Sequence, residues 1–487
     1  MNDFLYLRAG SIDQAGSFLR KHPEARLLAG GQSLLAAMKL GLCTPSHLVD
    51  LQDVPGLGDI ERQEDRLWIG AMVSHARVAA SPVVRAFAPM LADLAQGIAD
   101  QQVRELGTIG GSLANNDPAA CWPAGILATD ATIVTSQREI AADNFFKGLY
   151  GTALAAGELL VGLRFVCPTA AHYRKHEQPA SRFAMVGVAV ARLQRPADTV
   201  VRVAVTGLGN GVLRWTAAES ALGISWRVAS LDRLEFPAAD ALGDVHATAQ
   251  YRAHLVGVMC RRAVASLTGE KATRGKAPTT SGSPLPAALA AGPAAPTSAA
   301  MAPAPPGTVI KGSHLLTLNL AQVWQGILDP AVLQSCIPGC ESLQLVDINQ
   351  FTATVKVGIG PVSARFQTTL GLQNLQPPSP DGHATCALVF AGQAGGLGRG
   401  QGTAQVQLTA QDTGTRLDWQ ANTQVSGKIA QFGNRLIEAT ARKLSDEFFE
   451  RFASALSGTG GVESTDLSIR RVLLALWNRL RQPFLRR

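Results

Sequence analysis

Two short segments near the N-terminus contain residue types suited to binding phosphate groups. The first glycine segment (residues 29–33) reads Ala-Gly-Gly-Gln-Ser, and the second glycine segment (residues 108–112) reads Thr-Ile-Gly-Gly-Ser. Glycine tolerates positive φ, and its missing Cβ lets a ligand lie against the backbone. Consecutive N–H groups in such a turn, beside a helix N-terminus, bind phosphate oxygens without a cation. One pair alone is more simply a tight turn, but a second such pair about eighty residues further on strengthens the interpretation as a phosphate-binding site.

Regular elements must position these segments. The first glycine segment lies between an apolar run and a periodic stretch with Leu34, Leu35 and Met38, which predicts a strand, a turn and a helix. The pattern then predicts a strand at 67–69, one helix over 83–98 and strands at 131–135 and 158–166. Strands at 183–192 and 201–205 and a helix over 249–267 indicate a further unit of mixed α and β structure.

Composition indicates an α+β multidomain protein. A chain of 487 residues with 46% apolar and 17% charged residues predicts three or more folding units with sizeable cores. The seven cysteines form no C-x-x-C pair, which argues against a zinc ribbon, a disulfide framework or an iron–sulfur cluster held by this chain. We expect no catalytic acid or base and no metal ligands. The N-terminus lacks a secretory pattern, so we expect a cytoplasmic protein.

The second half of the chain divides into three parts. Residues 271–307 contain eight prolines and no aromatic residue, which predicts a disordered Pro/Ala linker that could reach on the order of 100 Å. Six β-patterned segments between 309 and 425, followed by a long helix over 429–456, predict a curved antiparallel sheet around one helix, enclosing an apolar cavity. The tail (residues 466–487) has six arginines and no acidic residue after Asp466, so the rest of the chain carries only +1 of the formal +7.

The tail also has apolar residues at helical spacing, at Ile469, Val472, Leu473, Leu476, Trp477 and Leu480. A basic amphipathic tail helix with a tryptophan suits the surface of an anionic membrane, where each arginine contributes about 1 kcal/mol. Docking on a partner protein or a nucleic acid is the alternative, but nothing else in the sequence resembles a nucleic-acid-binding module.

Residues 1–270 resemble the medium, FAD-binding subunits of molybdenum hydroxylases, and most closely that of aerobic carbon monoxide dehydrogenase. The resemblance lies in residues 27–40 (LLAGGQSLLAAMKL), residues 105–133, which include the second glycine segment, and the closing segment 244–255. It implies a vanillyl-alcohol-oxidase type FAD-binding fold of two lobes over 1–170, with their boundary near residue 51. A small α+β C-terminal flavoprotein domain over 171–270 follows.

The same resemblance implies which residues contact FAD. The implied cofactor-binding residues are Ala29, Gly30, Gly31, Gln32, Ser33, Thr108, Ile109, Gly110, Gly111, Ser112 and Asp117. Two departures affect the side-chain contacts. Ser112 stands where the family usually has asparagine, and Asn115-Asn116 precede Asp117-Pro118 where the family usually has His-Ala.

Residues 308–457 resemble the G subunit of carbon monoxide dehydrogenase. The resemblance lies in residues 328–340 (LDPAVLQSCIPGC), 355–362 (VKVGIGPV) and 427–433 (GKIAQFG). It implies a helix-grip, START-like domain linked to membrane attachment and quinone handling.

Together, the two resemblances imply an FAD-binding electron-transfer subunit of a molybdenum hydroxylase, peripheral on the inner face of the cytoplasmic membrane. Partner subunits would carry the molybdenum cofactor and the [2Fe–2S] clusters, and a quinone would accept the electrons. One alternative is the same subunit in an aldehyde, purine or aromatic heterocycle hydroxylase. The other is a non-catalytic assembly and membrane-targeting adaptor with a vestigial flavin site.

Overall fold

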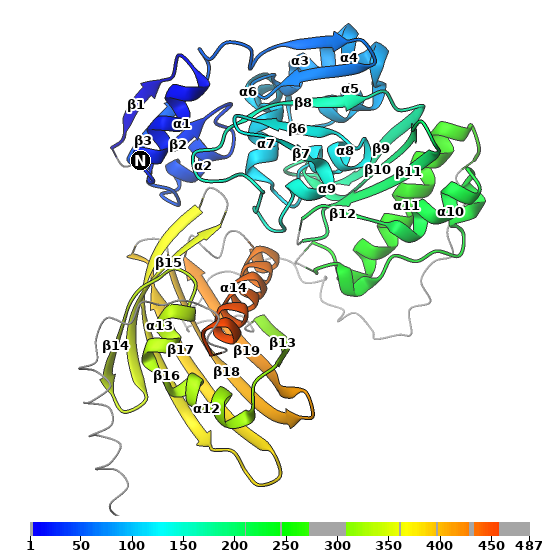
Figure 1. Ribbon diagram of the computed structural model, residues 1–487. Helices are drawn as coiled ribbons and strands as arrows, with labels where there is room; N and C mark the ends of the chain where they lie inside the picture. The colour runs from blue at the N-terminus through cyan, green and yellow to red at the C-terminus, as the bar shows by residue number, and fades with distance from the viewer. Residues whose placement is uncertain are drawn as a thin grey trace, which may run out of the picture.

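The structure, a computed structural model, describes residues 3–209, 211–243, 246–271, 308–359, 362–395, 398–427 and 433–456. The predicted linker beyond Lys271 and the predicted tail lie outside the described residues. Figure 1 shows two parts, which we call the N-terminal part (residues 3–271) and the C-terminal domain (residues 308–456). None of the described helices has both the length and the apolar character needed to cross a membrane.

Lobe 1 (residues 3–50) is a three-stranded parallel sheet with two crossover helices. Its strands are in the order β1-β3-β2, and parallel neighbours need crossovers of the kind that α1 and α2 make. Ser11 caps α1 by accepting a hydrogen bond from the N–H of Gln14. The elements of lobe 1 are β1 (Leu5–Arg8), α1 (Ile12–Lys21), β2 (Arg26–Leu28), α2 (Leu34–Lys39) and β3 (His47–Asp50).

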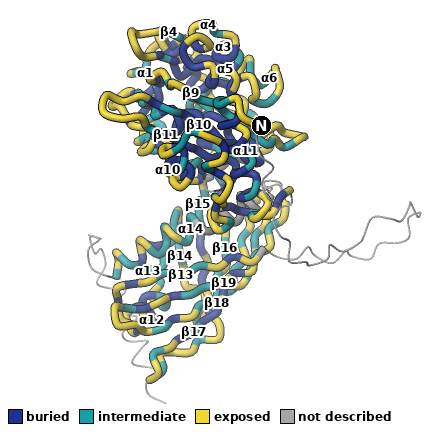
Figure 2. The backbone as a smooth tube through the Cα atoms, turned by 90° about the vertical axis from the view of Figure 1, so that its right-hand side faces the viewer, coloured by how far each residue is buried: buried dark blue, intermediate teal, exposed yellow. Residues whose placement is uncertain are grey.

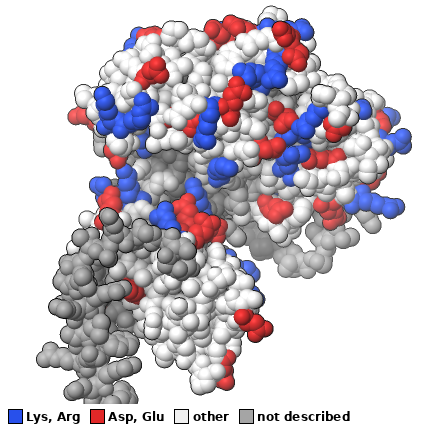
Figure 3. All heavy atoms as spheres, in the orientation of Figure 1, with Lys and Arg blue, Asp and Glu red and all other residues white. Residues whose placement is uncertain are grey.

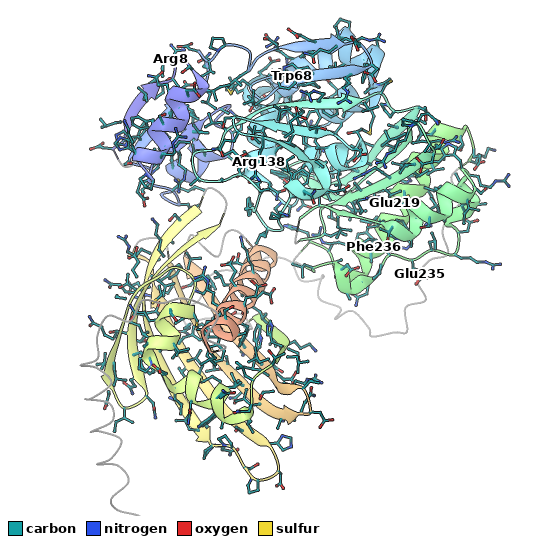
Figure 4. All side chains as sticks on the ribbon, in the orientation of Figure 1. Arg8, Trp68, Arg138, Glu219, Glu235 and Phe236 are labelled. Carbon is teal, nitrogen blue, oxygen red and sulfur yellow. The ribbon has the colours of Figure 1, made fainter. Side chains whose placement is uncertain are left out.

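Lobe 2 (residues 51–166) packs helices on a five-stranded antiparallel sheet of order β4-β5-β8-β6-β7. Trp68 of β5, labelled in Figure 4, lies over Gly162 of β8 so closely that a Cβ there would be 2.4 Å from the indole. The elements are β4 (Ile60–Gln63), β5 (Arg66–Gly70), α3 (His75–Ala80), α4 (Pro82–Phe87), α5 (Pro89–Gln96), α6 (Gln101–Leu106), α7 (Ile109–Asn115), α8 (Trp122–Ala128), β6 (Thr132–Thr135), β7 (Glu139–Ala141), α9 (Ala142–Phe145) and β8 (Leu160–Val166).

The single helix predicted over 83–98 is wrong, because the structure has two helices there. Pro89 begins α5, and Ala88 before it takes the extended φ of −147°. Proline disfavours a helical conformation for the residue that precedes it, and its ring cannot continue a helix from the N-terminal side. The apolar periodicity of the segment continues across this break, which is why the pattern alone predicted one helix.

A third unit adds a four-stranded antiparallel sheet of order β12-β11-β10-β9, which is buried on both faces. One face of β10 and β11 joins the core of lobe 2 through Ala189, Ala191 and Ala204, while the other packs with Val256 of α11. These strands form a buried centre in Figure 2. The elements are β9 (Ala170–Glu177), β10 (Ala184–Gln194), β11 (Thr199–Thr206), β12 (Leu213–Arg214), α10 (Thr216–Ile224), two short 3₁₀ turns (Val228–Leu231 and Ala238–Asp240) and α11 (Ala249–Thr268).

The C-terminal domain is a seven-stranded antiparallel sheet, of order β13-β19-β18-β17-β16-β15-β14, that curves around the long helix α14 (Figure 1). Its core contains Val323, Trp324, Cys336 and Phe452, and Gly326 lets the ring of Phe452 lie against α12. The pattern predicted the long helix and six of these seven strands, but it missed β14 (Cys340–Asp347). The elements are β13 (Thr308–Leu316), α12 (Leu320–Leu328), α13 (Pro330–Cys336), β14 (Cys340–Asp347), β15 (Gln350–Ile359), β16 (Val362–Gln376), β17 (His383–Gln393), β18 (Gly398–Gln411), β19 (Gly414–Gly427) and α14 (Gly433–Leu456).

Candidate functional site

A cavity of about 930 Å³ lies between the two lobes and is lined by both glycine segments. This volume is at the upper end of the range of small-molecule and cofactor sites, roughly 300–1,000 Å³. Residues 179–183, between β9 and β10, and Gly358 and Lys443 of the C-terminal domain also line it. The cavity is therefore bounded by all the folded units that the structure describes.

Ten of the eleven predicted cofactor-binding residues line this cavity. They are Ala29, Gly30, Gly31, Gln32, Ser33, Thr108, Gly110, Gly111, Ser112 and Asp117. Ile109 does not, because its side chain is fully buried in the core of lobe 2 and its N–H donates to the carbonyl of Val73 over 3.0 Å. The assignment of a ligand contact to Ile109 is therefore corrected to a packing role.

The first glycine segment passes unusually close to the chain that leads into the second. A Cβ at Gly30 would lie 2.0 Å from the carbonyl oxygen of Leu106 and 2.8 Å from Cα of Gly107. Gly31 has a φ of +70°, the left-handed conformation that glycine adopts without strain. Each glycine of this pair thus has its own requirement, one for close backbone approach and one for conformation.

The first glycine segment offers free backbone donors to the cavity. Within the described residues, no hydrogen bond engages the N–H groups of residues 30–33, between the end of β2 and the start of α2. Unpaired N–H groups of this kind need an acceptor from water or from a ligand. A diphosphate supplies several acceptor oxygens, so this segment fits the expectation of a nest.

The second glycine segment is not a loop with free donors, which corrects the expectation from its sequence. It forms the first turn of α7, where Thr108 is the N-cap and its Oγ1 accepts from the N–H of Gly111 over 3.0 Å. The N–H of Gly110 donates to Ala71, and that of Ser112 donates to Thr108. The backbone donors of residues 109–112 are therefore already paired within the protein.

Its glycines are required for packing. Both lie in helical backbone, and a Cβ at Gly110 would be 2.5 Å from Cβ of Ala71, while one at Gly111 would be 2.8 Å from Oγ1 of Thr108. The sequence pattern Gly-Gly is the same in both segments, but the physical reason for it differs. The second segment shapes the wall and leaves ligand contacts there to side chains such as Ser112 and Asn115.

Asp117 holds another residue at the cavity wall. Its Oδ2 accepts from the hydroxyl of Tyr150 over 2.9 Å, and its Oδ1 accepts from the N–H of Ala119 over 2.8 Å. The neighbouring Asn116 is fully buried in the left-handed conformation and donates to the carbonyls of Gly148 and Gly151. Asn116 thus fixes the loop that carries Tyr150, whereas Asn115 lines the cavity.

Two contributions to the site were missed from the sequence. His75, at the start of α3, lines the cavity and accepts a hydrogen bond from Trp122. Burial first, and the nearby Arg104 second, lower the pKa of His75 to about 4. The connection between β9 and β10 contributes Arg182 and Phe183, whose ring is 47% exposed. No motif in the sequence marks His75 or residues 182–183.

The residues present fit a dinucleotide such as FAD. The volume is large enough, four consecutive N–H groups have no acceptor within the described residues, and the lining includes the cationic side chains of Arg26, Arg182 and Lys443. Within the described part of the chain, no group of three or more His, Cys, Asp or Glu residues is placed to hold a metal ion. The fold and site thus define a dinucleotide-binding protein of two lobes.

Comparison with known proteins identifies the cofactor and the family. A profile described as the FAD binding domain in molybdopterin dehydrogenase matches residues 2–166. The nicotine 6-hydroxylase medium subunit of Paenarthrobacter nicotinovorans is 34% identical over 53% of this chain and 95% of its own. The carbon monoxide dehydrogenase medium chain of Afipia carboxidovorans is 35% identical over 54% of this chain and 95% of its own.

A solved structure agrees with these relatives. Reconstituted CO dehydrogenase from Oligotropha carboxidovorans superposes with a TM-score of 0.51 and 31% identity, covering 55% of this chain and 99% of that chain. The chain belongs to the FAD-binding medium subunits of molybdenum hydroxylases and is therefore an oxidoreductase subunit that binds FAD. A profile for the G subunit of carbon monoxide dehydrogenase (CoxG) matches residues 312–457, so a CoxG domain is fused to it.

Proposed function

We propose that this chain is the electron-transfer subunit of a carbon monoxide dehydrogenase-like complex, in which the fused CoxG domain brings a quinone to the flavin. The observation that carries the proposal is the position of the C-terminal domain at the rim of the FAD cavity, where Gly358 and Lys443 form part of its lining. Partner subunits with a molybdenum cofactor and [2Fe–2S] clusters would supply the electrons. The chain's residues bind and orient the cofactor, whereas bound FAD supplies the chemistry of one- and two-electron transfer.

Specific contacts hold the two parts together. Nζ of Lys356 lies 2.6 Å from Oε1 of Glu24 in lobe 1, and a hydrogen bond to Lys356 lowers the pKa of the Glu24 carboxyl. The N–H of Ser363 donates to the carbonyl of Leu42 over 2.8 Å. Figure 3 shows basic and acidic side chains gathered where the two parts meet. These contacts place the end of the β15–β16 hairpin against lobe 1.

A smaller cavity of about 160 Å³ also lies where the two parts meet. It is lined by Leu149 of the N-terminal part together with Lys356, Lys443, Glu447 and Arg451 of the C-terminal domain. This lining is rich in charged side chains and is distinct from the apolar cavity that the sequence predicts inside the domain. It supports a role for this end of the domain in docking against the N-terminal part.

The test follows the oxidation of reduced flavin. The full-length, FAD-loaded chain, reduced with dithionite without oxygen, is mixed with a short-chain ubiquinone analogue or with NAD⁺ in a stopped-flow spectrometer. We expect the flavin absorbance to return with the quinone and not with NAD⁺. The Lys356→Glu variant places two like charges at the interface, and we expect its oxidation to be about tenfold slower because the acceptor domain loses effective concentration.

A matched control for this variant is Lys311→Glu, which makes the same charge change on an exposed position of β13. It should behave like the wild type. Equal rates in the wild type and Lys356→Glu would contradict the docking role, and flavin that quinone fails to oxidise would contradict the choice of acceptor.

We also propose that the complex is cytoplasmic and attaches peripherally to the inner face of the cytoplasmic membrane. The β14–β15 hairpin supports this, because Leu345, Val346 and Ile348 at its tip are 54%, 64% and 78% exposed. The tip lies at the opposite end of β15 from Gly358, about 30 Å from the docked end at 3.3 Å per residue. An apolar tip together with the basic tail suits an anionic lipid surface.

Liposome flotation tests the attachment. With vesicles of phosphatidylcholine and phosphatidylglycerol, we expect the wild type to float, the Δ466–487 variant to remain mostly in the lower fraction and the Val346→Asp/Ile348→Asp variant to float less. Equal flotation of all three proteins would refute anchoring by either feature. Vesicles of phosphatidylcholine alone are the control for charge.

Among the candidate substrates of the partner subunit, carbon monoxide is favoured by the fused CoxG domain. The identity to a nicotine 6-hydroxylase subunit, 34%, is almost equal to the 35% with a carbon monoxide dehydrogenase subunit. Oxidation of an aromatic heterocycle is therefore the second candidate. Catalytic assays of the purified complex with each substrate distinguish the two.

A further inference from the structure

His75 lines the FAD cavity, and one of its two ring nitrogens is fixed by a hydrogen bond within the protein. The residue is only 5% exposed, and its Nδ1 lies 3.1 Å from Nε1 of Trp122, inside the core of lobe 2. An indole N–H is a donor and never an acceptor, so Nδ1 must be the unprotonated nitrogen of the ring. The proton of the neutral imidazole is therefore on Nε2.

The Nε2 edge of the ring faces the approach to the second glycine segment. A Cβ built on Gly107 would lie 3.0 Å from both Nε2 and Cδ2 of His75, and both residues line the cavity. Within the described residues, Nε2 makes no hydrogen bond, and it is not among the completely buried polar atoms. An N–H donor on the wall of a cavity that is held in place by its neighbours and lacks a partner is available to a ligand that fills the cavity.

This donor complements what the backbone provides. The first glycine segment offers free N–H groups, whereas the N–H groups of residues 109–112 are all paired within the protein. On the side of the cavity formed by α7, donors to a phosphate must therefore come from side chains. His75 is a side-chain donor on that side whose direction is fixed by a second hydrogen bond.

We propose that Nε2–H of His75 donates a hydrogen bond to a diphosphate oxygen of FAD, and that Trp122 is the positioning residue that sets this tautomer. The proposal rests on FAD binding in this cavity. Burial and the proximity of Arg104 lower the pKa of His75 to about 4, so the ring stays neutral at physiological pH and keeps a single donor. The contact is a directional hydrogen bond to an anion, which is stronger than one between neutral groups.

The experiment compares two variants of nearly equal shape that differ in the donor. His75→Gln keeps an N–H at about the distance of Nε2, and His75→Met has a similar length without a donor. Full-length apoprotein is titrated with FAD and, separately, with riboflavin, which lacks the diphosphate, by following flavin fluorescence. Thermal unfolding without ligand reports whether each variant folds.

We expect His75→Met to bind FAD about ten- to a hundredfold more weakly than the wild type, and His75→Gln to recover most of that loss. Riboflavin should bind all three proteins equally, which a general disturbance of the cavity would not allow. Trp122→Phe should weaken FAD binding by a smaller factor, because it frees the tautomer. His383→Phe, at an exposed histidine of the C-terminal domain, serves as the control.

The outcomes separate the two assignments. Equal FAD affinities for His75→Gln and His75→Met, or an equal loss for riboflavin, would overturn the role of His75 while leaving the FAD site intact. Failure of the wild type to bind FAD would overturn the cavity assignment itself.

Discussion

The Gly30→Ala variant is expected to lose FAD binding by at least about a hundredfold and to unfold more easily by about 3 kcal/mol. The new Cβ would lie 2.0 Å from the carbonyl oxygen of Leu106, and neither of these groups belongs to a flexible side chain that could move away. Relief of the clash requires the first glycine segment to separate from the chain leading into the second. That separation would change the orientation of the free N–H groups of residues 30–33, so that they would no longer converge on the diphosphate.

Fluorescence titration with FAD and denaturant-induced unfolding measure these two effects. Gly223→Ala in α10 is the matched control, because a Cβ there meets nothing within 4 Å and its φ is not positive. That variant should bind FAD normally and be no less stable than the wild type. Normal FAD affinity in Gly30→Ala would show that the contact between the two segments is dispensable.

The Arg202→Met variant is expected to lower the free energy of unfolding of the N-terminal part by about 3 kcal/mol. Arg202 of β11 is only 2% exposed and bonds to Asp130 at 2.7 Å, Asp143 at 2.6 Å and the carbonyl of Leu127 at 2.9 Å. These acceptors all belong to lobe 2, so this one guanidinium joins the third unit to lobe 2. Methionine would remove the donor that these three acceptors share, so that Asp130 would keep only Arg195 and Asp143 only Arg214.

The effect of Arg202→Met on stability should depend on pH, and a second variant serves as its control. Burial alone raises the pKa of Asp143, but Arg202 and then Arg214 outweigh it and hold this pKa below the ordinary 3.8. The stabilisation is therefore present above that pH and is lost as the pH falls below it, so the difference between wild type and variant should shrink in acid. Arg195→Met breaks an exposed pair with the same Asp130 and should cost less than about 1 kcal/mol. Similar urea midpoints for both variants would contradict the account.

Much of the secondary structure could be predicted from the sequence where the local pattern is compatible with a single type of element. The strand, glycine turn and helix around Gly30-Gly31, and the long helix and six of the seven strands of the C-terminal domain, follow from periodicity and were found. The single helix predicted over 83–98 was wrong, because Pro89 ends one helix and begins another while the apolar spacing of the segment continues. The predicted linker and tail lie outside the described residues and stay predictions.

The candidate site shows a different limit. The sequence showed that the two Gly-Gly pairs belong to one site. It did not show that their structural roles differ, because the N–H groups of Gly110 and Gly111 are paired with Ala71 and Thr108, which the pattern does not reveal. His75 was missed because its partner Trp122 is 47 residues away. Neither residue carries a motif, and only the hydrogen bond between the first residues of α3 and α8 shows that one ring nitrogen is fixed while the other has no partner.

The central claim is that one FAD binds in the cavity between the two lobes, held by free N–H groups of the first glycine segment. Its most direct test is a titration of the full-length apoprotein with FAD, followed by a crystal structure of the complex at saturation. The account predicts one FAD per chain, with diphosphate oxygens accepting from the backbone N–H groups of residues 30–33. No saturable binding, or a diphosphate bound elsewhere, would contradict it.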